Sequence, residues 1–217
     1  MNDWSFLPDL AWGSVNSVVI FVLTLLLSLP LGLLVYGGRV CPFKPLAWVV
    51  QFYISIMRGT PLMLQLMVVY FGPYYLFGVQ ISAEYRFYAV IIAFAINYAA
   101  YFAEIYRGGF QAIPAGQSEA AFVLGYSQRR TFFTIKVPQM FRTVLPSITN
   151  EVITLVKDTS LAFAISYTEM FTLAKQYASS TASMAPFVAA AVFYYVFNIV
   201  VAVLMDRLEK HVSKYAV

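Results

Sequence analysis

The chain has 217 residues, of which 61% are hydrophobic and 11% are charged, with a net charge of +4. Soluble domains rarely reach this apolar fraction. Continuous apolar runs of about 20 residues predict a multi-span helical membrane protein rather than a β-barrel, whose strands alternate. The basic residues are scattered among short loops, which indicates membrane orientation rather than nucleic-acid binding. The single cysteine, Cys41, excludes an intrachain disulfide and a cysteine-based metal site.

The amino-terminal segment has no basic stretch of the kind that begins a secretory signal peptide. No Lys or Arg precedes Arg39, and the first apolar run is long enough to span a membrane. We therefore expect no cleavable signal. Trp4 and Trp12 are typical of a membrane interface.

Hydropathy predicts one transmembrane domain over residues 1–217, with five helical spans and no strands. The expected spans cover residues 15–36, 46–71, 86–107, 144–163 and 187–205. Pro30 and Gly32 lie within the first span, and Pro61 is expected to kink the second.

Counting basic residues predicts the orientation. With the amino terminus outside, ten basic residues fall in cytoplasmic segments: Arg39, Lys44, Arg107, Arg129, Arg130, Lys136, Arg142, Arg207, Lys210 and Lys214. Only Arg86 and Lys175 fall in outer loops. This asymmetry favours an outer amino terminus and a cytoplasmic carboxyl terminus, which places residues 108–138 in the cytoplasm.

Polar residues inside the expected spans are the candidates for function. Asn97, Tyr101 and Glu104 are spaced to share one face of the third span. The fourth span carries a polar stripe of Asn150, Glu151, Thr154, Lys157 and Asp158. A carboxylate within a span must face a positive partner or water, and Lys157 is poorly placed to pair with its neighbour Asp158.

The cytoplasmic segment predicts two short helices joined by a glycine. Ser118 can cap the first, which Glu119, Ala120 and Ala121 favour, and Gly125 suits a left-handed helix end. Ser127 can cap the second helix, and Pro138 is expected to break it from the following span.

The spacing in this segment resembles the "EAA" loop of ABC-importer permease subunits. The matching residues are Glu119-Ala120-Ala121, Gly125 and Ile135-Lys136-Val137-Pro138. In that family the loop is a coupling helix that docks in a groove of the ATPase. The segments Arg58-Gly59-Thr60-Pro61-Leu62 and Lys157-Asp158-Thr159-Ser160-Leu161 also resemble polar amino-acid permeases, so the resemblance covers nearly the whole chain.

The resemblance implies an amino-acid uptake permease in a bacterial plasma membrane. It implies substrate contacts at Asn97, Asp158, Thr159 and Ser160, to which we add Arg58, and ATPase coupling through Glu119, Ala120, Ala121, Gly125, Ile135 and Pro138. The implied partners are two ATP-binding subunits, a second permease subunit, identical or paralogous, an extracytoplasmic substrate-binding protein and the lipid bilayer. No nucleic acid is expected.

Catalysis on this chain is not expected. The sequence has no Gly-x4-Gly-Lys-Ser/Thr motif, so ATP and Mg²⁺ would bind the partner ATPase, and the chain needs no cofactor of its own. The lone His211 lies in the tail, so neither a catalytic triad nor a metal site is expected in the spans.

Three alternatives remain open from the sequence. Asp158 and Glu151 could be ion sites of a secondary transporter or channel. Asp158 could form an ion pair, with Arg58 or an adjacent subunit, that only packs helices together. The chain could also be a scaffold subunit without a pore.

Overall fold

The computed structural model describes residues 4–213, which form helices joined by short connections. In chain order these are α1 (Leu7–Arg39), α2 (Lys44–Gly59), α3 (Leu62–Phe77), α4 (Tyr85–Gln111), α5 (Gly116–Val123), α6 (Gln128–Thr131), the π-helix η1 (Phe132–Lys136), α7 (Val137–Asp158), the 3₁₀-helix η2 (Thr159–Ile165), α8 (Met170–Thr181) and α9 (Ala185–Ser213). Within the described part of the chain there is no strand, as predicted. Lys214, which was counted for the orientation, lies outside the described residues.

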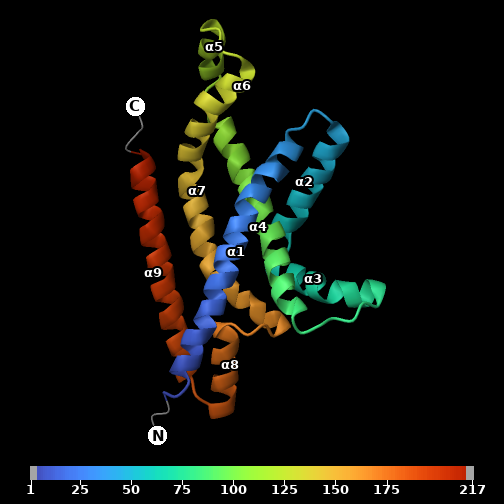
Figure 1. Cartoon of the computed structure of the whole chain (residues 1–217), viewed down its shortest axis with the longest axis vertical. Helices are drawn as coiled ribbons and strands as arrows, with labels where there is room; N and C mark the ends of the chain where they lie inside the picture. Colours follow the sequence, from blue (N-terminus) through green and yellow to red (C-terminus); the bar gives the residue numbers. More distant parts are fainter. Residues whose placement is uncertain (1–3, 214–217) are drawn as a thin grey trace.

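Three of the described helices are long and apolar enough to cross a membrane: α1, α4 and α9. They contain the expected spans 15–36, 86–107 and 187–205 and extend beyond them at both ends. In Figure 1 all three run along the long axis of the molecule, with α5 and α6 beyond the end where α4 finishes. The two short helices therefore project past the spans, at one end of the molecule.

The second expected span, over residues 46–71, is not a single helix kinked at Pro61. Two helices, α2 and α3, cover this region and meet at an angle of 112°. Thr60 has an extended backbone (φ −124°, ψ 150°) and precedes Pro61. Because a residue before proline is pushed away from the helical region and proline lacks an N–H, the helix ends at Gly59 and restarts at Leu62. At Pro61 the helix is therefore broken and not merely kinked.

The expected span over residues 144–163 coincides with α7 and η2. The α-helix ends at Asp158 and tightens into a 3₁₀-helix from Thr159 to Ile165. Because α7 carries the polar stripe, it is not among the helices that are apolar enough by composition to span a membrane. By that measure the described residues contain three spans, or four if α2 and α3 count as one. The five-span count remains a prediction.

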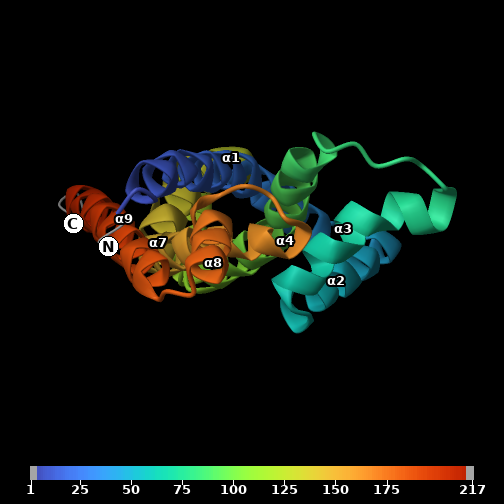
Figure 2. The same cartoon turned by 90° about the horizontal axis from the view of Figure 1, so that it is seen from below.

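The helix α4 is the centre of the fold, and close approaches by glycine bring its neighbours against it. A Cβ at Gly32 of α1 would lie 2.7 Å from the Phe102 Cβ of α4. A Cβ at Gly109 of α4 would lie 2.1 Å from a methyl group of Val144 of α7. Small residues at such crossings let membrane helices pack backbone to backbone. Seen along the long axis, α9 and α3 lie on opposite sides of the molecule (Figure 2).

A buried carboxylate organises the end opposite α5. Glu169 is fully buried and caps α8, accepting hydrogen bonds from the backbone N–H groups of Phe171 and Thr172, both at 2.7 Å. It also accepts bonds from the hydroxyls of Tyr194 on α9, at 3.0 Å, and Ser17 on α1, at 3.4 Å. The sequence analysis predicted no helix between the spans 144–163 and 187–205, so α8 was not expected.

Candidate functional site

Asp158 is paired with a tyrosine of α4. The Tyr98 hydroxyl donates to Asp158 Oδ2 at 2.7 Å, and Tyr98 is 2% exposed. Glu151, two helical turns earlier on α7, is half-buried and lies on the same side as Asp158, while Lys157 is exposed. Two carboxylates therefore line one face of α7, and a phenol fixes the deeper of them against α4.

Asn97 directly precedes Tyr98 in the chain, but its side chain forms hydrogen bonds at the break between α2 and α3. Its amide donates to the Met57 carbonyl at 3.0 Å and to Gln65 Oε1 at 2.8 Å. Both of its N–H bonds are used in this way, so it could meet a ligand only through Oδ1. The Gln65 amide donates in turn to the carbonyls of Met57, at 3.0 Å, and Thr60, at 3.1 Å. These two side chains satisfy carbonyl groups that the broken helix leaves without partners.

Arg58 belongs to a charge cluster around Glu104. The Glu104 carboxylate forms ion pairs with Arg39 of α1, with Arg107 of α4 at 2.8 Å and with Arg58 of α2 at 3.8 Å. The Arg58 guanidinium also lies 5.5 Å from the centre of the Tyr101 ring. Arg58 is the most exposed of the three arginines (46%) and makes the longest contact. The ion pair with Asp158 that the sequence left open is therefore replaced by one with Glu104.

The hydroxyls of Thr159 and Ser160 are turned to the backbone. They donate to the carbonyls of Val156 and Lys157, both at 2.8 Å. Thr159 is fully buried and Ser160 is half-buried. The predicted substrate residues thus do not form one constellation. Asn97, Asp158 and Arg58 belong to three separate bonded groups along α4, at Asn97, Tyr98 and Glu104, and Thr159 and Ser160 bond within their own helical segment. The sequence did not identify Gln65, Tyr98 or Glu104 as partners; the shared face of Asn97, Tyr101 and Glu104 was the signal that pointed to this helix.

The loop at the far end folds as helix, glycine, helix, as predicted. Gly125 has φ +74°. The Tyr126 N–H bonds to the Ala121 carbonyl and the Gly125 N–H to the Phe122 carbonyl, both at 2.9 Å. This pair of bonds is a Schellman end for α5.

Of the two helix caps predicted in this loop, one is confirmed and one is wrong. Ser127 caps α6, since its Oγ accepts the Arg130 N–H at 3.3 Å. The predicted cap at Ser118 is wrong, because α5 begins at Gly116 and Ser118 lies inside it. The predicted break at Pro138 is also wrong, because helical structure is continuous from Gln128 through η1 into α7, and Pro138 lies at the junction of η1 and α7.

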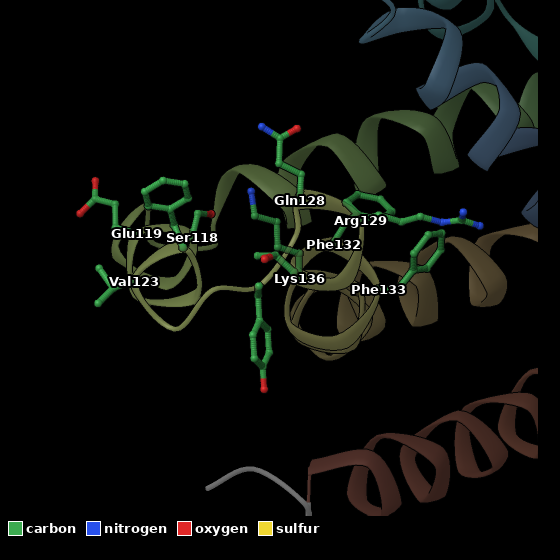
Figure 3. A pocket seen from close by; sticks show the side chains of 11 residues that line it. Ser118, Glu119, Val123, Gln128, Arg129, Phe132, Phe133 and Lys136 are labelled. Atoms are coloured by element: carbon green, nitrogen blue, oxygen red, sulfur yellow. The ribbon is translucent and has the colours of Figure 1, made fainter.

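Beside α5 lies a pocket of about 740 Å³, which α6 and η1 complete (Figure 3). Figure 3 shows Glu119 and Val123 on the α5 side, Phe133 on the opposite side and Lys136 between them. Three consecutive apolar residues of the loop, Phe122, Val123 and Leu124, are 82%, 83% and 72% exposed. An exposed apolar cluster of this kind, past the ends of the long helices, marks a contact with another protein or with a membrane. Of the remaining predicted coupling residues, Glu119 and Ala120 are exposed, Ala121 is buried and Ile135 is half-buried.

Comparison with known proteins agrees with this arrangement. Residues 28–214 match the family described as "Binding-protein-dependent transport system inner membrane component". The chain is 35% identical over 205 residues to an arginine transport system permease protein of Bacillus subtilis, covering 94% of this chain and 92% of that one. It is 31% identical over 213 residues to an L-cystine transport system permease protein of the same organism, covering 97% and 89%.

Solved structures share the fold. One chain of a structure described as "Crystal structure of an amino acid ABC transporter with histidines" matches with a TM-score of 0.87 at 30% identity, and the match covers 95% of each chain. The MetNI methionine ABC transporter matches with a TM-score of 0.72 at 18% identity, which shows likeness of fold. The resemblance stated from the sequence is confirmed: the chain belongs to the family of binding-protein-dependent inner-membrane transport components, the ABC-transporter permeases, and is a transport subunit, not an enzyme.

Proposed function

We propose that this chain is one of two permease subunits of an amino-acid importer driven by ATP. The relatives it resembles are named for arginine and L-cystine transport. Two ATPase subunits would bind ATP and Mg²⁺ on one side, and an extracytoplasmic binding protein would deliver the substrate on the other. The amino terminus would lie outside and the carboxyl terminus in the cytoplasm, with five helical crossings of a bacterial plasma membrane.

The observation that carries this proposal is the exposed end of α5. Phe122, Val123 and Leu124 offer apolar side chains beyond the spans, next to a pocket with basic and acidic residues at its edge. A helix presented in this way fits a groove of a partner protein. Closure of the ATPase pair on ATP binding would move α5 and, through the continuous helix from α6 to α7, the polar face that carries Asp158.

The substrate site would lie along the facing polar sides of α4 and α7. Asp158 and Glu151 offer negative charge to an ammonium group, Asn97 offers its Oδ1, and Thr159 and Ser160 keep acceptor capacity on hydroxyls whose protons are engaged. Arg58, exposed and held loosely by Glu104, is the group suited to a substrate carboxylate.

Disrupting the docking surface tests the proposal. Val123→Glu places a charge in the exposed apolar cluster, so the ATPase subunits should no longer purify with the permease, and ATP hydrolysis stimulated by the loaded binding protein should be lost. Gln117→Glu, an exposed position on the same helix, is the matched control and should retain both. Unimpaired complex formation and ATP hydrolysis with Val123→Glu would contradict docking through α5.

A further inference from the structure

An apolar groove of about 570 Å³ lies between α1, α7 and α9, away from the polar face described above. Its lining includes Leu29 and Leu33 of α1, Phe141 and Ile148 of α7, and Leu208 of α9. Three of these side chains, at Leu33, Phe141 and Leu208, are 39%, 44% and 46% exposed. The groove is therefore an open furrow on the surface of the helices, with large side chains along its length.

The length of the groove matches half of a bilayer. Its lining follows α7 from Phe141 to Val152, which are eleven residues apart and therefore about 16 Å apart along the helix at 1.5 Å per residue. The hydrocarbon core of a bilayer is about 30 Å thick, so this is about the depth of one leaflet. An acyl chain of that leaflet would lie along the groove.

A charged pocket of about 340 Å³ continues the groove at the end nearer α5, and Leu145 and Val212 line both. It adds two basic residues, Arg142 and Lys210, and two acidic residues, Asp206 and Glu209. Lys210 pairs with Asp206 at 2.6 Å, and Glu209 accepts a hydrogen bond from the Thr149 hydroxyl. Among the described residues Arg142 forms no ion pair.

We propose that the groove and the charged pocket together bind one zwitterionic phospholipid, of the phosphatidylethanolamine kind. The acyl chain fills the groove, the phosphate meets Arg142, and the ammonium meets Asp206 and Glu209. Guanidinium groups suit phosphate oxygens, and carboxylates suit an ammonium group. Equal numbers of acidic and basic side chains complement a headgroup with both charges better than one with net negative charge.

A lipid fits this groove better than a protein helix does. Helices that associate within membranes approach through glycine, alanine and serine, whereas the groove is lined by Leu, Ile, Val, Met, Phe, Tyr and Pro. The outward face of α9 beside it is also aliphatic and exposed, as at Val200, Val203 and Leu204. In the orientation given under the proposed function, the lipid would lie in the cytoplasmic leaflet; the binding itself does not depend on that orientation.

Lipid retention tests the proposal without any transport measurement. The full-length permease, with its partner subunits if they co-purify, is placed in nanodiscs of equal phosphatidylethanolamine and phosphatidylglycerol, and then released into detergent for native mass spectrometry. We expect one phosphatidylethanolamine retained per chain, in preference to phosphatidylglycerol. Equal retention of the two lipids, or retention of neither, would overturn the proposal.

Two variant pairs locate the lipid. Leu208→Trp fills the groove and should abolish retention, whereas Leu204→Trp, one turn away on the same helix and outside the groove lining, should retain the lipid. Arg142→Gln should weaken retention about tenfold through loss of a charge-assisted bond, and Arg207→Gln, which does not line the pocket, should not. Thermal unfolding confirms that each variant is folded. Retention unchanged in Leu208→Trp, or a photo-crosslink from position 208 to another polypeptide in place of lipid, would contradict the assignment.

Discussion

The bond between Tyr98 and Asp158 shows how this fold keeps a carboxylate within its helices. An unpaired carboxylate at membrane depth costs several kcal/mol, and the phenol at 2.7 Å offsets part of that cost without removing the charge. Among the described residues Asp158 forms no salt bridge, and its neighbour Lys157 is exposed. In the proposed site this charge would face a cationic group of the substrate.

Asp158→Asn tests this availability. The substitution keeps the size of the side chain and an acceptor for Tyr98 but removes the charge. If the site binds an ammonium group, apparent affinity in uptake assays should fall about ten- to hundredfold, since a charge-assisted hydrogen bond contributes about 1.5–3 kcal/mol. Co-purification with the ATPase subunits serves as the control for assembly. Unchanged uptake kinetics in an assembled complex would leave Asp158 with a packing role alone.

Gly125 is the residue whose backbone conformation sets the turn between α5 and α6, the loop that we propose couples to the ATPase. Its φ of +74° is outside the range of proline, and its N–H bonds to the Phe122 carbonyl. Gly125→Pro should therefore misplace α5 and abolish ATP-driven uptake, while the protein still inserts in the membrane. Gly125→Asn is the matched control, because asparagine tolerates the left-handed region, and it should retain most activity. Normal stimulated ATP hydrolysis in Gly125→Pro would show that the loop does not transmit the signal.

At the scale of elements, the break between α2 and α3 depends on side chains that replace helical hydrogen bonds. Gln65 donates to the carbonyls of Met57 and Thr60 and accepts from Asn97. Gln65→Ala removes these bonds and a further one to the Thr60 hydroxyl at 2.8 Å, all in a buried or partly buried region, and should lower the free energy of unfolding by about 1–3 kcal/mol. Val68→Ala, at an exposed position of the same helix, should have little effect. Thermal unfolding in detergent compares the two, and equal midpoints would mean that Gln65 does not hold the break.

The sequence predicts the long helices well because their signal is local. Apolar length alone places α1, α4 and α9, and the left-handed glycine places the turn after α5. The direction of α3 after Pro61 could not be predicted from the neighbouring residues, because a proline after Gly-Thr can mark either a kink or a complete break of the helix. Which one occurs depends on distant groups, here Asn97, that satisfy the freed carbonyls.

The candidate site was predictable in composition but not in pairing. Asn97 and Asp158 stood out as polar residues in apolar surroundings. Their partners Gln65 and Tyr98 did not, because glutamine and tyrosine are ordinary in such helices until the packing places them. The cluster of three arginines on Glu104 likewise joins residues of α1, α2 and α4. Spacing along the chain indicates only its Glu104–Arg107 pair, three residues apart on one helix, and not the pairs with Arg39 and Arg58.

For the whole molecule, the proposed orientation is predicted from the distribution of charge and can be checked by labelling. On a background with Cys41→Ser, Gln128→Cys in the coupling loop should react with a membrane-impermeant maleimide only from the cytoplasmic side. Ser179→Cys on α8 should react only from outside. Both positions are exposed, so access is decided by the membrane and not by burial. Reaction of both from the same side would contradict the proposed topology.

Reconstituted uptake tests the central claim most directly. The permease is placed in proteoliposomes with its ATPase subunits and binding protein, and uptake of labelled amino acids is measured with ATP on the ATPase side. Uptake should require ATP hydrolysis and every partner, and Val123→Glu should abolish it. Uptake that a proton gradient sustains without ATP or the ATPase subunits would contradict the account and identify Asp158 and Glu151 as ion sites of a secondary transporter.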